Sequence, residues 1–478
     1  MRLGHELKRL GKHSAIYGLG GLVARILATV LLPLYTHYLP PRAYGRVEVV
    51  TAASAVLAIV LQMGIAAAFF RFYFDAKEPP AKLTVVRTSF WFTMTMATVG
   101  LVLGLVFASP VSHWIGLGHD PSLVRAGAVG LWAQTNYNQL TALFRVEERS
   151  TQFALASVTN VLVTVTAMVV FVAVLHWGAI GLVVGNFTGT LVVYLALLAY
   201  RREQLGLEFD RELFRQMQKF GMPLVPSAIA LWAINWIDRE FVIWYKGQAE
   251  VGIYSAALKI STAITFLMVA FRTAWPAFAY SIEDDREAKR TYSFVLTYLL
   301  ALMSWAALFL GALAPWVVAL LTNPRFQRAD RGVALLCFAE VLYAGYVVLA
   351  IGSGRARRTQ LNWVVTGAGA AVNIGFNFWL IPRWGMIGAS ISQVIAYATL
   401  FAGMTWYAQH VYPVPHRWRR NATAVLAAAA LTVAARAAHL PLALSFLLVL
   451  AYPLALAALG FFLPAERQRL RRLVPLFR

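Results

Sequence analysis

The sequence contains few charged residues and almost no cysteine. Cys337 is the single cysteine among 478 residues, so no disulfide forms within the chain and no cysteine-based metal site is expected. Charged residues make up 13% of the chain, whereas soluble domains carry about 25%. Hydrophobic residues make up 60%. This composition excludes a water-soluble protein and indicates burial against lipid.

Long apolar stretches fill almost the whole chain. A membrane-spanning helix needs about 20 mostly apolar residues, and only short connections separate the stretches of this length. There are 14 of them, near residues 14–38, 47–70, 88–108, 126–144, 153–175, 178–199, 221–245, 252–278, 293–314, 332–353, 360–381, 385–408, 421–438 and 441–463. The first is too long for the core of a signal peptide, so we expect it to be retained as a helix. The sequence therefore predicts an all-α polytopic membrane protein with 14 transmembrane helices.

Acidic residues are scarce as well, which leaves a formal net charge of +21. Such a charge suits a nucleic-acid partner, but the cations follow the alternation of the spans. Of the 42 Lys and Arg residues, 29 fall on one set of loops and the two termini, and nine fall on the opposite loops. Cytoplasmic loops are enriched in Lys and Arg. We therefore expect both termini in the cytoplasm and no nucleic-acid partner.

Two short patterns recur at a displacement of 207 residues. Residues 177–181 (Trp-Gly-Ala-Ile-Gly) return at 384–388 (Trp-Gly-Met-Ile-Gly), and Tyr38 with Gly45 returns as Tyr245 with Gly252. The predicted organisation is a six-helix lobe at 1–200, a cytoplasmic connector at 201–220, a second six-helix lobe at 221–411, and two C-terminal helices with a basic tail at 412–478. Because each half has an even number of helices, both halves enter the membrane in the same direction, a plan common in transporters.

Four cations fall inside predicted spans: Arg25, Arg239, Lys259 and Arg272. A cation at the centre of a membrane helix costs about 2.5 kcal/mol or more, so each needs a partner, water or a functional reason. Arg25 lies in the middle of its span and is expected to bind an anionic group in a cavity; an interhelical salt bridge is the alternative. Lys259 is deep enough for the same role. Arg272 is a further candidate for substrate binding, and the alternative is that it reaches lipid phosphates from its position near a span end.

Aromatic and amide side chains accompany Arg239. Trp232, Asn235 and Trp236 precede it at helical spacing and project from the same face. Indole, amide and guanidinium groups suit a sugar or phosphate ligand, which makes these four residues candidates for substrate binding. Trp and Arg near a helix end also form the ordinary interfacial belt, and the sequence leaves both interpretations open.

Glu340 lies deepest among the acidic residues and is the candidate ion-coupling group; a structural hydrogen bond or ion pair is the alternative. The span 126–144 holds amides that are expected to form a cavity wall or interhelical hydrogen bonds, namely Gln134, Asn136, Asn138 and Gln139. The glycine-containing segment 352–355 lacks the Lys-Ser/Thr ending of a nucleotide-binding loop. We therefore expect no cofactor and no ATP drive, with a proton or sodium gradient as the energy source.

Several short segments resemble a known family. Residues 18–21 (Gly-Leu-Gly-Gly) with Arg25, and 39–45 (Leu-Pro-Pro-Arg-Ala-Tyr-Gly), look like the first helix and loop of polysaccharide-synthesis flippases of the multidrug/oligosaccharidyl-lipid/polysaccharide (MOP) superfamily. Residues 237–239 (Ile-Asp-Arg) and 250–255 (Glu-Val-Gly-Ile-Tyr-Ser) are similar to their junction between helices 7 and 8. The resemblance extends over the whole chain in length, helix number and two-lobe plan, and it marks the family rather than the substrate.

The resemblance implies an O-antigen (Wzx-like) flippase in the bacterial inner membrane, which moves undecaprenyl-pyrophosphate-linked oligosaccharide to the outer leaflet by alternating access. The implied partners are this lipid-linked substrate, membrane lipids and polysaccharide-assembly proteins. Intramembrane cations suit an anionic pyrophosphate, whereas a MATE-like exporter of cationic drugs favours acidic cavities and is the second interpretation. A lipid II flippase and a membrane glycosyl polymerase are weaker alternatives. The polymerase needs a longer outer loop than any expected here, so we expect no enzyme.

Overall fold

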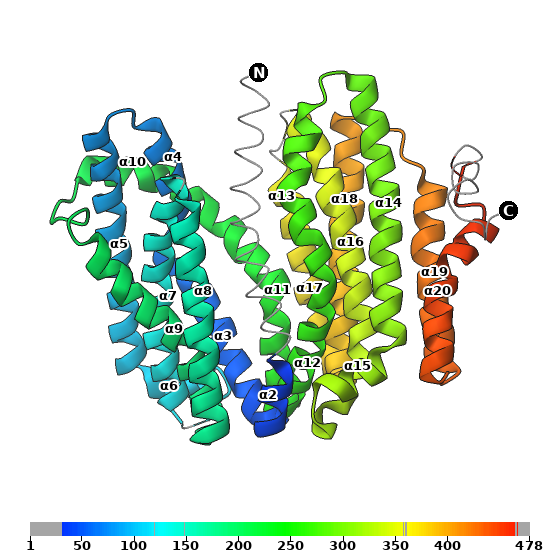
Figure 1. Cartoon of the computed structure of the whole chain (residues 1–478), viewed down its shortest axis with the longest axis horizontal. Coiled ribbons are helices and arrows are strands. Elements are labelled where there is room, and N and C mark those ends of the chain that lie inside the picture. Colours follow the sequence, from blue (N-terminus) through cyan, green and yellow to red (C-terminus); the bar gives the residue numbers. More distant parts are fainter. Residues whose placement is uncertain are drawn as a thin grey trace. The chain divides into compact units, whose positions relative to one another are not determined.

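The computed structural model describes residues 31–463 and 466, apart from 119, 148, 357, 359 and 360, and over these residues the chain forms helices and no strand. The helices are labelled in Figure 1. The chain divides into two compact units. Unit 1 contains the described residues of Met1–Ala256, Thr322–Phe326 and Asn373–Ala389, and unit 2 contains those of Ala257–Leu321, Gln327–Val372 and Ser390–Arg478.

Unit 1 is built around a long polar helix, α7. Its helices are α2 (Leu32–Tyr38), α3 (Pro41–Gln62), α4 (Ile65–Asp75), α5 (Pro79–Val106), α6 (Ala108–Trp114), α7 (Ser122–Val146), α8 (Ser150–Met168) with a π-helical end η1 (Val169–Val174), α9 (Gly178–Arg201), α10 (Arg211–Gly221), η2 (Met222–Leu224) and α11 (Val225–Lys246). Both α5 and α9 pack against α7, and α8 packs against α9 (Figure 1). Large apolar side chains, including Phe69, Phe144 and Tyr194, are fully or almost fully buried between these helices.

Unit 2 is organised around α14, which packs against α16 and α19. Its elements are η3 (Thr262–Ile264), α13 (Thr265–Ser281), α14 (Asp285–Ala312), α15 (Ala314–Leu321), part of η4 (Pro324–Ala329), α16 (Asp330–Arg355), α19 (Trp418–Ala437) and α20 (Leu442–Ala458). Three helices have residues in both units: α12 (Gln248–Ser261), α17 (Asn362–Trp384) and α18 (Met386–Val411). Small residues such as Ala424 and Ala428 are fully buried on α19, and they allow the close helix approach that stabilises packing in lipid.

Nine helices of the described part are long and apolar enough to cross a membrane, or ten if the bent pair Arg211–Ala230 and Trp232–Lys246 is one span. The predicted number of 14 therefore stays a prediction. Each predicted span after the first coincides with helix, but several predicted as continuous are interrupted, and the span 221–245 contains η2 and the bend of this pair. The span 47–70 is broken between α3 and α4 at Met63 and Gly64, and the span 252–278 is broken by η3 between α12 and α13.

The displacement of 207 residues also relates the helix bounds. Adding 207 to the first residues of α3, α5, α7 and α9 gives the first residues of α12, α14, α16 and α18 to within one residue, and the short helices α6 and α15 correspond in the same way. The two Trp-Gly turns share a backbone conformation, because φ is +60° at Gly178 and +56° at Gly385. Glycine adopts this left-handed conformation without the strain that a side chain adds. Both turns precede equivalent helices, α9 and α18.

The connector before α11 forms the amphipathic helix α10. Asp210 caps its start, because its carboxylate accepts from the backbone N–H groups of Glu212 and Leu213 at 2.9 Å. Met217 is fully buried, and the ring of Phe214 packs 4.8 Å from that of Phe92 on α5. The segment predicted as a connector at 201–220 thus contains a helix with one buried face.

Candidate functional site

A polar cavity of about 460 Å³ lies within unit 1, among α3, α4, α5 and α7. We call it the polar pocket. It is lined by Gln62, Ile65, Ala66, Ala67, Phe70, Thr93, Thr135, Asn138, Gln139, Ala142 and Arg145. Amide, hydroxyl and guanidinium groups thus meet in one cavity, and no aspartate or glutamate is among the lining residues.

The amides predicted on α7 do form both a cavity wall and interhelical hydrogen bonds. Asn138 and Gln139 line the polar pocket. Gln139 Nε2 also donates to Ser89 Oγ on α5 at 3.0 Å, and Gln134 Nε2 donates to Asn138 Oδ1 at 2.9 Å along the helix. Asn136 Nδ2 donates to the Trp132 carbonyl at 2.8 Å. These bonds fix the amide wall in place before a ligand arrives.

Two buried hydroxyl groups of the pocket wall lack a partner. Thr93 on α5 and Thr135 on α7 are 2% and 3% exposed, and neither Oγ1 atom has a hydrogen-bond partner among the described residues. A buried polar atom without a partner is costly and needs an explanation, such as a ligand or water. The polar pocket therefore offers free hydrogen-bonding capacity beside a fixed amide wall.

Arg145 gives the polar pocket its positive charge. The predicted span ends at residue 144, but α7 continues to Val146, so Arg145 occupies the last helical turn. Its guanidinium lies 5.3 Å from the centre of the Phe70 ring. Arginine in such a position binds phosphate through a planar fork of donors.

The break between α3 and α4 shapes the edge of the polar pocket. Gln62 ends α3 and Ile65 begins α4, with Met63 and Gly64 both in the left-handed conformation between them. A side chain on Gly64 would collide with the backbone of Gly221 at the end of α10. The helix is thus interrupted where the chain needs a glycine for a close backbone contact, although the apolar run in the sequence continues.

Arg239 on α11 is buried, with 8% of its surface exposed, and its Nε lies 3.6 Å from Glu48 Oε2 on α3. Its Nη1 donates to the Asn235 carbonyl at 2.9 Å, and the guanidinium lies 4.2 Å from the centre of the Trp236 ring. Arg239 thus forms an ion pair with Glu48 that links α11 to α3. Its substrate-binding role stays a prediction.

The neighbouring Asp238 contacts two further helices. Its carboxylate accepts from Asn377 Nδ2 on α17 at 2.7 Å and from the Tyr254 hydroxyl on α12 at 2.8 Å. Asp238, Asn377 and Tyr254 are all buried. Through Asp238 and Arg239, which are adjacent in the chain, α11 thus makes buried polar contacts with α3, α12 and α17.

The other predicted site residues are distributed over both units. Trp232 Nε1 donates to the Ala52 carbonyl at 3.1 Å, whereas Asn235 has an exposed side chain. In unit 2, Lys259 on α12 is half-buried, and the exposed Arg272 on α13 lies 5.7 Å from the centre of the Tyr343 ring. Glu340 on α16 is half-buried in the same unit.

Arg25 lies outside the residues that the structure describes. The substrate-binding roles of Arg25, Lys259 and Arg272 and the coupling role of Glu340 therefore stay predictions. Within the described ranges, no group of three or more His, Cys, Asp and Glu side chains lies close enough together to bind a metal ion.

Sequence comparison identifies the family. The model of the family described as "Polysaccharide biosynthesis protein" matches residues 10–282, more than half of the chain. An uncharacterized membrane protein of Methanocaldococcus jannaschii is 23% identical over 209 residues, which are 42% of this chain and 40% of that protein. The lipid III flippase of Escherichia coli K12 is 22% identical over 402 residues, which are 80% of this chain and 92% of the flippase.

Solved structures share the fold. The lipid II flippase MurJ, in an inward closed conformation, matches 94% of this chain and 99% of its own with a TM-score of 0.73 and 10% identity. An inward-facing MATE multidrug transporter of the MOP superfamily matches 81% of this chain and 94% of its own, with a TM-score of 0.69 and 15% identity. The chain is a multi-pass membrane protein that belongs to the polysaccharide biosynthesis protein family.

Proposed function

We propose that this protein is a flippase that moves undecaprenyl-pyrophosphate-linked oligosaccharide across the bacterial cytoplasmic membrane by alternating access, for the synthesis of O-antigen, capsule or exopolysaccharide. The polar pocket of unit 1 is the observation that supports this proposal. Amides and hydroxyls pair with sugar hydroxyl groups, and Arg145 attracts a pyrophosphate. Asn138 and Arg145 therefore supply the two kinds of contact that such a substrate needs.

The charge of the polar pocket separates this proposal from multidrug export. A transporter of cationic drugs needs acidic groups where the drug binds, but the pocket is lined by one arginine and no carboxylate. The MATE-like alternative rests on a shared fold, and a fold hosts several functions. An anionic substrate fits the lining residues better than a cationic one.

Transport of a defined substrate tests the proposal. Proteoliposomes with the purified full-length protein would be loaded with a fluorescent undecaprenyl-pyrophosphate oligosaccharide, and translocation would be followed by quenching from outside. Arg145→Gln and Asn138→Leu should each lower the initial rate at least about tenfold, because each removes a polar contact worth about 1.4 kcal/mol or more. Arg149→Gln is the matched control, since Arg149 lies four residues further along the chain, lines no part of the pocket and has an exposed side chain whose Nε lies 3.2 Å from Glu147 Oε2.

If Arg145→Gln and Asn138→Leu translocated the substrate at the wild-type rate, the proposed role of the pocket would be contradicted. Absence of translocation by the wild-type protein, together with efflux of a cationic dye such as ethidium, would favour the multidrug exporter. Arg25 is the further candidate for binding the anionic head group. Arg25→Lys should retain part of the transport, because it keeps the charge but loses the planar donor fork.

We propose that an ion gradient drives transport and that Glu340 senses the ion. An ion shifts a conformational equilibrium only if it binds one of the two states more tightly than the other. A carboxyl group inside a membrane helix can have a different affinity for the ion in each state. Glu340→Gln should transport at a rate that no longer depends on an imposed pH or sodium gradient. Unchanged dependence would assign coupling to another group or to the membrane potential.

A further inference from the structure

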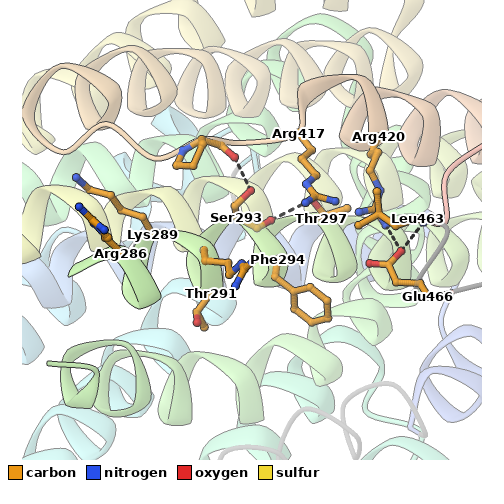
Figure 2. A pocket seen from close by; sticks show the side chains of 12 residues that line it. Arg286, Lys289, Thr291, Ser293, Phe294, Thr297, Arg417, Arg420, Leu463 and Glu466 are labelled. Atoms are coloured by element: carbon orange, nitrogen blue, oxygen red, sulfur yellow. Dashed lines mark hydrogen bonds and ion pairs between the residues drawn. The ribbon is translucent and has the colours of Figure 1, made fainter. Parts of the chain in front are cut away.

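A second cavity, of about 850 Å³, lies in unit 2 where α14 and α19 begin. We call it the basic pocket. It is lined by Arg286, Lys289, Arg290, Thr291, Ser293, Phe294, Thr297, Pro415, Arg417, Arg420, Leu463 and Glu466. Five cations and one carboxylate thus surround one cavity. Figure 2 shows Arg417, directly before α19, and Arg420, on α19, extending toward the part of α14 that holds Ser293 and Thr297.

Two of these cations are held by other protein groups. Arg420 Nη2 lies 2.8 Å from Glu466 Oε2, and its guanidinium lies 4.7 Å from the centre of the Phe461 ring. Lys289 Nζ lies 3.0 Å from Asp285 Oδ2 and 4.9 Å from the centre of the Tyr412 ring. These contacts fix Arg420 and Lys289 in the wall, so the cavity is formed without a ligand.

The other three cations have no such partner. Within the described ranges, no ion pair or side-chain hydrogen bond links Arg286, Arg290 or Arg417 to another residue. Three like charges around one cavity repel one another, and an anion between them relieves this repulsion.

Two neutral polar side chains of the wall are engaged within the protein. Ser293 Oγ donates to the Pro415 carbonyl at 2.8 Å (Figure 2), and Thr297 Oγ1 donates to Asn421 Oδ1 at 2.7 Å. The charged donors that remain for a ligand belong to Arg286, Arg290 and Arg417, and the Thr291 hydroxyl also lines the cavity. Recognition in this cavity therefore depends mainly on negative charge.

The basic pocket also borders the apolar surface of the unit. Phe294 on its wall is 55% exposed, and Leu302, two turns further along α14, is 45% exposed. The helix α14 is itself long and apolar enough to cross a membrane. A ligand with an anionic head in the cavity can thus extend an apolar chain along α14, as a lipid in the membrane does.

We propose that the basic pocket binds the phosphate group of an anionic membrane lipid. Guanidinium groups bind phosphate oxygens in pairs, and basic pockets between membrane helices on the cytoplasmic side bind lipid head groups. The lipid is either a bilayer phospholipid or a polyprenyl pyrophosphate, which present the same phosphate chemistry. The proposal concerns binding in unit 2 and does not depend on the polar pocket of unit 1.

Lipid binding to the full-length protein in detergent tests this proposal by native mass spectrometry. The probes are cardiolipin, undecaprenyl pyrophosphate, zwitterionic phosphatidylethanolamine and inorganic pyrophosphate. The variant Arg286→Gln/Arg290→Gln/Arg417→Gln removes the three cations without described partners. The matched control Arg211→Gln/Arg215→Gln/Lys219→Gln removes three exposed cations from α10, which line no part of the basic pocket.

Each cation near a lipid phosphate contributes about fivefold in affinity, so the pocket variant should bind an anionic lipid on the order of 100-fold more weakly. The control should bind like the wild type. Selective loss of cardiolipin binding identifies a bilayer phospholipid, and selective loss of undecaprenyl pyrophosphate binding identifies the polyprenyl lipid. The proposal would be overturned if the pocket variant and the control lost affinity for anionic lipid equally, or if the pocket variant bound anionic lipid like the wild type. It would also be overturned if the wild type bound inorganic pyrophosphate as tightly as an anionic lipid. None of these outcomes depends on transport.

Discussion

Gly45 and Gly252 pack backbone to backbone where α3 meets α12, and each occupies the same position in its own half of the repeat. A Cβ atom on Gly45 would lie 2.9 Å from Gly252 N, and one on Gly252 would lie 3.1 Å from Gly45 N. The Cβ atom on Gly45 would also collide with the carbonyl oxygen of Gln248, and the Cβ atom on Gly252 would collide with the carbonyl oxygen of Pro41. Because Pro41 and Gln248 are also 207 residues apart, the contact is reciprocal, as in a two-fold interface.

Alanine at either glycine should force these backbones apart. Overpacking of a close contact costs about 1–3 kcal/mol, so we expect Gly45→Ala and Gly252→Ala each to lower the thermal midpoint of the detergent-solubilised protein by several degrees. Gly375→Ala on α17 is the control, because no atom lies within 4 Å of a Cβ built there. If the thermal midpoints of Gly45→Ala and Gly252→Ala equalled that of the control, the contact between α3 and α12 would tolerate a side chain.

The ion pair between Glu48 and Arg239 predicts a double-mutant effect. Removal of one partner leaves a buried charge, so Glu48→Gln and Arg239→Gln should each destabilise the protein by about 3–5 kcal/mol. The double variant Glu48→Gln/Arg239→Gln should recover most of this loss, as measured by thermal unfolding in detergent. If the effects of the two single variants are additive, the pair is not coupled. Transport by a stable double variant then tests whether Arg239 also binds substrate.

His416, in the segment between α18 and α19, predicts a pH dependence of stability. Burial lowers the pKa of His416 to about 4, whereas an unfolded chain has a histidine pKa of about 6.5. Between these pH values the unfolded state binds more protons, so the free energy of unfolding should fall as the pH drops from about 6.5 toward 4. His416→Gln should show a smaller fall than the wild type. His410→Gln is the control, since His410 has an exposed side chain, and an equal pH dependence of all three proteins would contradict the prediction.

Cysteine labelling tests the predicted orientation. In a Cys337→Ala background, Trp114→Cys on α6 and Leu207→Cys before α10 place a thiol on side chains that are 76% and 91% exposed. An impermeant maleimide should label Trp114→Cys in intact cells and Leu207→Cys only after permeabilisation, because the excess of Lys and Arg marks the cytoplasmic loops. The reverse pattern would invert the topology.

The sequence predicts long apolar helices well. The spans 178–199 and 332–353 differ from α9 and α16 by at most two residues at each end, because the apolar run ends where the helix ends. The break at Gly64 depends on contact with Gly221, which is distant in the chain, and the apolar run continues through it. Local pattern therefore reveals helices but not the interruptions that tertiary contacts impose.

The sequence likewise predicts some of the candidate functional residues and misses others. The amides of α7 were predicted because polar side chains are unusual in an apolar span. Glu48 was missed because α3 begins at Pro41, six residues before the predicted span, so that Glu48 is buried within the helix and not at its border. The basic pocket unites cations from segments more than 100 residues apart. No local pattern indicates that Arg290 and Arg417 line one cavity.

The polarity of α7 has a consequence for how the protein enters the membrane. This helix is 25 residues long but does not qualify as apolar enough to span a membrane alone. Its amides find partners on helices made before and after it, since Gln139 binds Ser89 on α5 and the Thr190 hydroxyl on α9 donates to Gln134 Oε1 at 3.5 Å. We therefore expect α7 to insert stably only together with its neighbours, once α9 has been synthesised. A nascent chain that ends before α9 is then expected to leave the amides of α7 without the partner that α9 supplies.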